Sequence, residues 1–535
     1  MKPPPAHIQH ITVTTPGVAK LLHDLKINKA SGPDNIPNIV LKTLANNIAP
    51  ILTLIFQASL DSGRLPQDWL GANVTCAFKK GDRHSPSNYR PISLTSVPCK
   101  ILEHIVYRHI LDHLNNHQIL TSLNHGFRAG FSTETQLLTT THDLLTSYDS
   151  KKQVDMMILD FSKAFDTVPH DRLLHKLSHY GITGPIHSWL TCFLTERMMQ
   201  VVVEGISSPS TTVDSGVPQG TVLGPLLFLC HINDLPGAVK SQVRLFADDC
   251  LIYREIDDYS DHLKLQADLT SLEQWAEQWG MRFNASKCYV MSLTKNPGSS
   301  FFYSLNNTIL QQVPQNPYLG LQFSSNLSWS THINSITKKA NSTLGFLRRN
   351  LKHCPTLCKR NAYLALVRPL LEYGAIIWDP HQKQDIDKLE RVQRVAVRFI
   401  ANDYRSRTPG FVTGLLNKYE LPTLQERRVS QRLTFFFRIA QGLVPAIPPE
   451  KFLTPQRMGR RIRPPARPDF IENNPVHKYT RNNDRCYKVP ESNTLELRHS
   501  YFPKTIIEWN QLEDRIVNSG TTEAFKQALA TARRH

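Results

Sequence analysis

Two adjacent aspartates interrupt an apolar stretch near the middle of the chain. Val243 to Phe246 and Leu251 to Tyr253 have the length and composition of strands, and Asp248 and Asp249 stand in the short turn between them. Apolar strands joined by so tight a turn form a two-stranded hairpin. Side chains alternate along a strand, so the two carboxylates are expected to point to different sides. Asp is common in turns, so this pair by itself is weak evidence for function.

A third aspartate, Asp160, ends another apolar run. Val154 to Leu159 is typical of a buried strand and is broken only by Asp155. An unpaired charge at the end of such a strand is costly, and the next helical pattern begins too late for Asp160 to cap it. Carboxylate oxygens and substrate phosphates are the ligands that Mg²⁺ prefers, and two such ions can activate one oxygen and stabilise another. The aspartates therefore predict a site for two Mg²⁺ ions.

The segments that contain these aspartates resemble those of a known family. Leu159 to Asp166 (LDFSKAFD) and Phe246 to Asp249 (FADD) resemble the catalytic motifs of reverse transcriptases of non-LTR (LINE-class), jockey-like retrotransposons. Ser215 to Leu226 (SGVPQGTVLGPL) resembles the segment that holds the template–nucleotide pair. Shorter segments with the same resemblance, in the same order, are Ala30 to Pro37, Lys79 to Asp82, Asn88 to Leu94, His125 to Arg128, Asn284 to Cys288 and Tyr318 to Gly320. The ordered resemblance makes the assignment far more specific than any single motif.

The resemblance implies an α/β fold in the form of a right hand. Residues 28–324 would form the reverse transcriptase fingers and a palm built on an antiparallel sheet. Residues 325–380 would form a helical thumb. Residues 1–27 would be an N-terminal segment, and residues 381–535 a basic, mostly helical C-terminal region of unknown function.

The resemblance also implies roles for individual residues. Asp160 and Asp248 would bind both Mg²⁺ ions, with the carbonyl oxygen of Phe161 as a further ligand and Asp249 as a weaker electrostatic partner. Lys287 would protonate the leaving pyrophosphate. Residues expected to contact the incoming nucleotide are Lys80, Arg90, Phe165 and Gln219.

Each of these roles has a plainer alternative. Lys80, Arg90 and Lys287 are also consistent with ordinary surface charge. The ring of Phe165 would stack under the nucleotide sugar and exclude ribonucleotides, but Phe is usually a core residue.

The charge of the chain favours a polyanionic partner. The formal net charge is +17, and such an excess attracts nucleic acid and releases its counterions. Residues 331–370 contain eight Lys or Arg, no Asp or Glu, and an apolar pattern of helical spacing. Residues in this stretch that are expected to lie along a phosphate backbone are Lys338, Lys339, Arg348 and Arg349. The alternative for this stretch is a solvated helix face.

Residues 446–470, rich in Pro and Arg, are expected to form a linker or basic strap.

These observations predict an RNA-directed DNA polymerase that extends a primer 3′-hydroxyl with dNTPs. Its partners would be an RNA template, a DNA primer and dNTPs, and its oligomeric state stays open. Two alternatives also stay open. The chain could be a catalytically inactive, nucleic-acid-binding remnant, which the intact aspartates disfavour. It could also be a DNA-templated polymerase, which the segments around Phe246 and Arg90 disfavour.

The remaining features concern the cysteines, the cellular compartment and the domains that the chain carries. Nine cysteines have no repeating spacing, and Cys354 and Cys358 lack a partner pair, so we expect two core thiols and not a zinc site. No signal peptide or membrane span is recognisable, so we expect a nuclear or cytoplasmic protein without a membrane partner. Members of this family carry an endonuclease before the polymerase. No such segment is recognisable before Ala30, so the chain is expected not to cut DNA.

Overall fold

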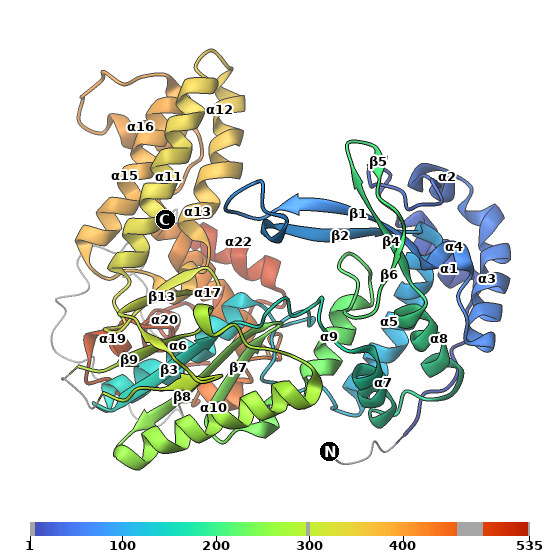
Figure 1. Ribbon diagram of the computed structural model, residues 1–535. Helices are drawn as coiled ribbons and strands as arrows, with labels where there is room; N and C mark the ends of the chain where they lie inside the picture. Colours follow the sequence, from blue (N-terminus) through green and yellow to red (C-terminus); the bar gives the residue numbers. More distant parts are fainter. Residues whose placement is uncertain (1–5, 296–299, 457–484, 533–535) are drawn as a thin grey trace.

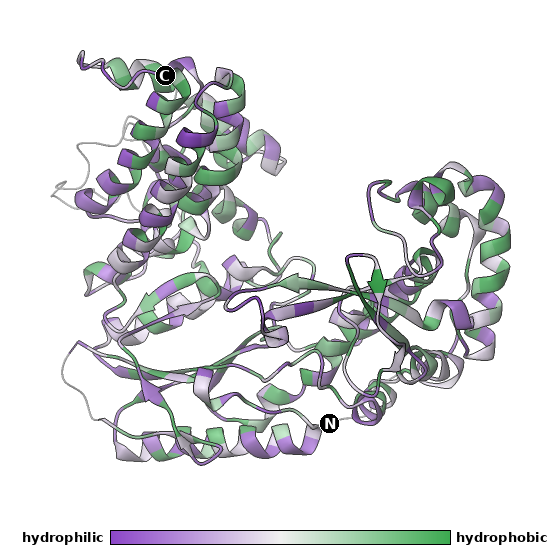
Figure 2. Cartoon of the chain, turned by 45° about the horizontal axis from the view of Figure 1, so that its top comes forward, coloured by the Kyte–Doolittle hydropathy of each residue, from purple (hydrophilic) through white to green (hydrophobic). Residues whose placement is uncertain are grey.

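The computed structural model describes residues 6–295, 300–456 and 485–532. The fold is mixed α/β (Figure 1), as expected. Its core consists of two hydrophobic clusters, one mainly of residues before 310 and one that extends to residue 532. In Figure 2 hydrophobic and hydrophilic residues are mixed along most helices, as expected for helices that bury one face. The basic strap predicted at 446–470 lies outside the described residues from position 457 onward.

A five-stranded sheet lies between the two clusters. Its order is β12 (Gln311–Gln312), β9 (Tyr289–Leu293), β3 (Gln153–Leu159), β8 (Asp249–Ile256) and β7 (Gln242–Phe246). The expectation of an antiparallel sheet is confirmed for the four longer strands, but β12 pairs parallel with β9. Met157 and Leu159 of β3 belong to the first cluster, and Val154 and Met156 belong to the second. Both faces of β3 are therefore buried, which explains its continuous apolar run.

One helix covers each face of this sheet. Helix α10 (Tyr259–Trp279) belongs to the first cluster and helix α6 (Thr133–Asp149) to the second. The carboxylate of Asp258 caps the start of α10, and Gly280, with φ 70°, ends it. Gly can adopt this left-handed conformation without steric cost, so the helix ends at the residue that the sequence marks.

The N-terminal part of the chain surrounds a second sheet. In this sheet β1 pairs antiparallel with β2 and parallel with β4, which in turn pairs with β5 and β6. In Figure 1 the β1–β2 hairpin projects from the helices of this part. The strands are β1 (Gly71–Phe78), β2 (Tyr89–Thr95), β4 (Met198–Val203), β5 (Ile206–Ser207) and β6 (Thr211–Thr212). The helices are α1 (Thr15–His23), α2 (Asn38–Thr43), α3 (Ala45–Ser62), α4 (Gln67–Leu70), α5 (Val97–Asn116), α7 (His170–His179), α8 (Gly184–Thr195) and α9 (Gly224–Ile232), with the 3₁₀ turns η1 (Pro86–Asn88) and η2 (Leu235–Ala238).

In the part of the chain that the structure describes after β14, every regular element is helical. Two short hairpins and a 3₁₀ turn precede these helices: η3 (Ala285–Lys287), β10 (Ser304–Leu305), β11 (Thr308–Ile309), β13 (Gln315–Tyr318) and β14 (Leu321–Ser324). The helices are α11 (Ser330–Asn350), α12 (Thr356–Ala362), the π-turn η4 (Tyr363–Val367), α13 (Arg368–Glu372), α14 (Ala375–Trp378), α15 (Lys383–Ala401), α16 (Phe411–Lys418), α17 (Leu424–Ala440), α18 (Pro449–Phe452), α19 (Leu495–Arg498), α20 (Tyr501–Trp509), α21 (Asp514–Val517) and α22 (Thr522–Ala532). Within the described ranges, no helix has the length and apolar character needed to cross a membrane.

A buried ionic cluster joins these late helices to the residues around 380. Asp379, just after α14, accepts hydrogen bonds from Arg428 (2.8 Å), Lys504 (2.6 Å) and Arg432, and Arg432 also donates to Glu508 (2.5 Å). The pKa of the Asp379 carboxyl is lowered by Lys504 and the two arginines, which outweigh the opposite effect of burial. Removing one partner of such a cluster leaves an uncompensated buried charge, so α14, α17 and α20 are held together as a unit.

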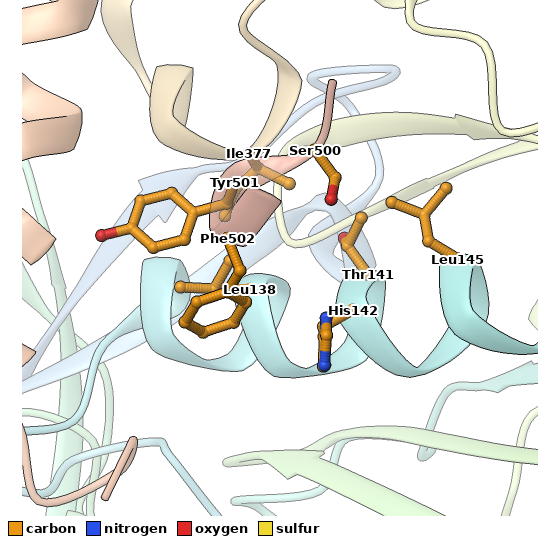
Figure 3. A pocket seen from close by; sticks show the side chains of 8 residues that line it. All are labelled: Leu138, Thr141, His142, Leu145, Ile377, Ser500, Tyr501 and Phe502. Carbon is orange, nitrogen blue, oxygen red and sulfur yellow. The ribbon is translucent and has the colours of Figure 1, made fainter. Parts of the chain in front are cut away.

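Helix α6 of the central sheet also contacts the C-terminal residues. Asp149, at its end, accepts backbone N–H groups of Asn493 (2.9 Å) and Thr494 (2.6 Å). Figure 3 shows side chains of α6, including Leu138 and Leu145, beside Ile377 and Tyr501 around a small pocket. The expected boundary at 380/381 therefore falls within one continuous hydrophobic cluster.

The expectation of two core thiols is wrong for at least one of the two residues. Cys358 is exposed on α12, and Cys354 is partly exposed. Cys354 lies in the loop before α12, so the helical spacing of the apolar residues did not indicate the exposure of the two thiols.

Candidate active site

The three aspartates lie at one end of the central sheet, where β3 and β8 meet. Leu159 pairs with Cys250, so Asp160 follows β3 next to the start of β8, and Phe246 pairs with Asp249 to close the β7–β8 hairpin. Ala247 and Asp248 form the turn, and Ala247 has the left-handed φ of 54°. The predicted hairpin is thus confirmed. We call Asp160, Asp248 and Asp249 the carboxylate cluster.

The carboxylates of this cluster repel one another. Burial raises the pKa of Asp249 to about 6, and the charges of Asp248 and Asp160 add to this effect. Burial also raises the pKa of Asp248, as does Asp160, while Lys79 and Arg90 act in the opposite direction. Like charges at short range disfavour ionisation, so a cation placed among these groups would relieve the repulsion.

The donor set of the cluster suits a hard cation such as Mg²⁺, because every side-chain donor is a carboxylate oxygen. The ammonium of Lys287 lies 3.4 Å from Oδ2 of Asp160 and offsets part of its charge. In the described residues, no three His, Cys, Asp or Glu side chains are arranged as a ready metal cage. Mg²⁺ often completes its coordination with water and substrate phosphates, so the cluster fits a metal that is bound together with substrate.

Strand register decides which lysine shares a face with Arg90. Ala77 pairs with Arg90 across the β1–β2 hairpin, and the N–H of Lys79 donates to the carbonyl of Asn88 (2.8 Å), continuing the ladder. Because side chains alternate, Lys79 lies on the face of Arg90, whereas Lys80 lies in the bend that follows. The influence of both Lys79 and Arg90 on the pKa of Asp248 agrees with this placement. Lys79 was not singled out by the sequence, because the residue motif does not give the register.

Phe165 is half-buried beside the cluster. Its ring stacks on Phe228 (centroids 4.3 Å apart, planes at 16°) and meets the edge of Phe127 (6.0 Å, 80°). Phe228 is completely buried, whereas Phe127 is 51% exposed. Phe165 therefore connects the core with an exposed aromatic surface, an arrangement compatible with either role predicted for it.

The segment around Gln219 packs closely against residues that follow Asp160. The side-chain amide of Gln219 donates to Asp166 (3.0 Å), and the backbone carbonyl of Gln219 accepts the N–H of Ser93 (2.7 Å). Gly216 and Gly220 have φ of 88° and 105°, and a Cβ at either would lie within 2.8 Å of a backbone oxygen. Only glycine permits both this conformation and this approach.

A buried carboxylate outside the predicted set fixes the same segment. Glu103 of α5 accepts the N–H groups of Val222 (2.7 Å) and Leu223 (3.1 Å), just before α9 begins. A negative charge is favourable at a helix N-terminus. Glu103 is distant in sequence from the groups that it binds, so no local pattern indicated this role.

The four basic residues predicted for the nucleic-acid surface all lie exposed on α11. The guanidinium of Arg348 stands over the ring of Tyr404 at 4.8 Å. We call these four residues the basic surface of α11. The absence of Asp and Glu over residues 331–370 leaves that surface without local acidic partners.

Comparison with known proteins agrees with this geometry. Residues 78–323 match the family model described as "Reverse transcriptase (RNA-dependent DNA polymerase)". Two relatives from Drosophila melanogaster are 30% identical: the "Probable RNA-directed DNA polymerase from transposon BS", over 81% of this chain and 50% of the relative, and the "RNA-directed DNA polymerase from mobile element jockey", over 73% and 44%. A 28% identical relative from Popillia japonica is the "Retrovirus-related Pol polyprotein from type-1 retrotransposable element R2", over 45% and 35%. The chain thus spans half or less of the length of these relatives.

The raised pKa of Asp249 predicts a pH-dependent cost to stability. A carboxyl with a raised pKa stabilises the fold fully below its unfolded pKa of about 4, and this contribution is lost as pH rises through about 6. In metal-free buffer at pH 7.5, Asp249→Asn should therefore raise the unfolding free energy by about 1 kcal/mol, a figure reduced for solvent screening. At pH 4.5 the substitution should have little effect. Thermal unfolding at both pH values measures this, with the partly exposed Asp387→Asn on α15 as a control. An equal effect at both pH values would contradict the prediction.

Proposed function

The chain belongs to the reverse transcriptase family, and we propose that it is an RNA-directed DNA polymerase that extends a DNA primer with dNTPs on an RNA template. Its relatives place it among the non-LTR, jockey-like elements. The observation that carries the proposal is the convergence of Asp160, Asp248 and Asp249 at one end of the sheet, inside the matched domain.

In this proposal the chain has the fingers, palm and thumb of a right-hand polymerase. Residues 28–324 comprise fingers, including the β1–β2 hairpin, and a palm built on the central sheet. Residues 325–380, with α11 to α13, are the thumb. Residues 1–27 precede these parts, and residues 381–535 are a C-terminal region whose role is open.

Asp160 and Asp248, with the carbonyl oxygen of Phe161, would hold two Mg²⁺ ions. When bound, these ions supply activation of the primer hydroxyl and charge neutralisation at the phosphates. Asp249, next to Asp248 in the hairpin, would add its negative charge to the local field. A nuclear or cytoplasmic site of action fits this chemistry.

The transferred group carries a large negative charge that the protein must offset. The primer 3′-hydroxyl gives its proton to solvent as its oxygen forms a bond to the α-phosphorus, and the bond from that phosphorus to pyrophosphate breaks. Arg90 and Lys79, on one face of the β1–β2 hairpin, offset the triphosphate charge, and Lys79 takes the role first expected for Lys80. Lys287, which pairs with Asp160 in the free protein, donates the proton to pyrophosphate.

Two further residues select the nucleotide. Gln219 rests against the incoming base pair, held by Asp166 and the backbone of Ser93. Phe165 presents its ring to the sugar, supported from behind by Phe228. A 2′-hydroxyl against this ring would lose hydration without gaining a partner, so deoxynucleotides are preferred.

The exposed basic residues of α11 contact the phosphates of the duplex. Lys338, Lys339, Arg348 and Arg349 carry positive charge on a helix that neighbours no acid in its own stretch. Phosphate contacts of this type position a nucleic acid without reading its sequence. Such contacts also make the binding sensitive to salt.

The primary test is primer extension on poly(rA) with oligo(dT), dTTP and Mg²⁺. The wild-type chain should extend the primer, and Asp248→Asn should lower the rate by about a thousandfold or more, because it removes charge that holds the metals. Asp387→Asn is the control, and duplex binding by fluorescence anisotropy should be unchanged in both variants. Extension by Asp248→Asn within a few-fold of wild type would refute the metal assignment. Duplex binding without extension by the wild type would support an inactive remnant, and a preference for poly(dA) would support a DNA-templated enzyme.

Lys79 and Lys80 form a matched pair of variants. Lys79→Ala should raise the KM for dTTP about tenfold, the equivalent of one charge-assisted contact. Lys80→Ala should change the KM less than about twofold, because Lys80 lies in the bend beyond the strand, whereas Lys79 and Arg90 act on Asp248. Steady-state kinetics at saturating primer–template measures both. The reverse order of effects would show that the hairpin presents its other face to the nucleotide.

Phe165→Ala tests whether Phe165 is a gate, meaning a ring that excludes ribonucleotides from the site, or only a residue of the hydrophobic core. As a gate, the variant should lower the preference for dTTP over UTP by about tenfold or more while retaining dTTP extension. As a core residue, it should lose about 3–5 kcal/mol of stability and reduce both activities together. Phe165→Tyr keeps the ring and should retain the preference. An unchanged dTTP-to-UTP ratio with a lower melting temperature would exclude the gate.

A further inference from the structure

Residues 123–125 form a short extra edge of the central sheet beside β7. The N–H of Leu245 donates to the carbonyl of Leu123 (2.9 Å), and the N–H of His125 donates to the carbonyl of Leu245 (3.0 Å). Asn124 therefore pairs with Leu245 in a parallel bridge, two residues before the turn that carries Asp248. The backbone of this segment is fixed next to the carboxylate cluster.

The side chain of Asn124 reaches the turn itself. Its Oδ1 accepts the N–H of Ala247 (3.2 Å) and the N–H of Gly126 (3.0 Å), and the residue is only 3% exposed. Ala247 has the left-handed φ of 54°, a conformation that costs a residue with a Cβ roughly 1 kcal/mol or more. A buried acceptor that binds the Ala247 N–H stabilises this conformation.

Gly126 lets the segment approach the turn closely. A Cβ at this position would lie 2.4 Å from the nitrogen of Ala247 and 3.0 Å from its Cβ. Any other residue would push the turn away. The turn is thus enclosed between residues 124–126 on one side and the start of β8, which follows it directly, on the other.

We propose that Asn124 is a positioning residue that sets the geometry of the Asp248–Asp249 turn for metal binding. The inference rests on the proposed function, but it concerns a residue that touches neither metal nor substrate. Without the Asn124 acceptor, the turn can leave its left-handed conformation and carry the carboxylate of Asp248 with it. A displacement of about 1 Å at a reacting centre can lower a rate on the order of 100-fold.

The test compares variants of Asn124 with a control on the same segment. Asn124→Leu keeps the side-chain volume and removes the acceptor, Asn124→Ala removes both, and Asn124→Asp keeps an acceptor oxygen. Asn233→Ala is the control, because Asn233 accepts the N–H of Thr121 (2.8 Å) and donates to the carbonyl of Ile119 (2.8 Å) without contacting the turn. Both Asn124→Leu and Asn233→Ala lose hydrogen bonds to this segment, but only the first should affect metal binding.

Two measurements are made, one of which needs no catalysis. Binding of Mn²⁺ to the complex with a dideoxy-terminated primer, template and dTTP is followed by electron paramagnetic resonance. Asn124→Leu and Asn124→Ala should weaken it about tenfold or more, and Asn124→Asp and Asn233→Ala should leave it within a few-fold. In primer extension, the first two variants should lower kcat and raise the Mg²⁺ requirement, with the duplex Kd unchanged.

The outcomes distinguish the positioning role of Asn124 from the proposed polymerase activity. If Asn124→Leu binds Mn²⁺ as tightly as Asn233→Ala, the positioning role is wrong. If the wild type binds Mn²⁺ but does not extend a primer, the proposed polymerase activity fails, and the Mn²⁺ affinities of the variants still decide the role of Asn124. If the wild type binds no Mn²⁺, both proposals are overturned.

Discussion

The pairing of β3 with β8 holds three carboxylates together against their mutual repulsion. Burial, and after it the neighbouring carboxylates, raises the pKa values of Asp248 and Asp249, so negative charge at this site is unfavourable. They stay together because β3 is buried on both faces, in one hydrophobic cluster on each side of the sheet. Hydrophobic packing thus supplies the energy that keeps the electrostatic site assembled.

Close backbone approach brings the other parts of the site to this sheet. Gly216 and Gly220 allow the Gln219 segment to lie directly against residues after Asp160 and against β2. The buried carboxylate of Glu103 then fixes the end of that segment at the start of α9. Small residues and backbone N–H groups therefore set distances in the site as much as the charged side chains do.

Local patterns in the sequence predicted β3, the β7–β8 hairpin and the aspartates that follow or join these strands, because each depends on residues that are close in the chain. Contacts between distant residues were not predictable in this way. Lys79 was missed because pairing with β2 decides which lysine shares a face with Arg90, and Glu103 because the N–H groups it binds lie 119 and 120 residues away. The parallel edge strand β12 has only two residues, too few to show a periodicity.

The contact between Asp149 and residues 493–494 has a consequence for how such chains can diverge. Helix α6 covers one face of the sheet, and its last residue binds backbone far towards the C-terminus. A chimera that joins α6 of one relative to the C-terminal residues of another would have to match this junction and the cavity beside it, lined by Leu138, Ile377 and Tyr501. Recombination within the gene would thus succeed most readily where the exchanged piece carries both sides of the contact, so α6 and residues 493–494 are constrained to change together.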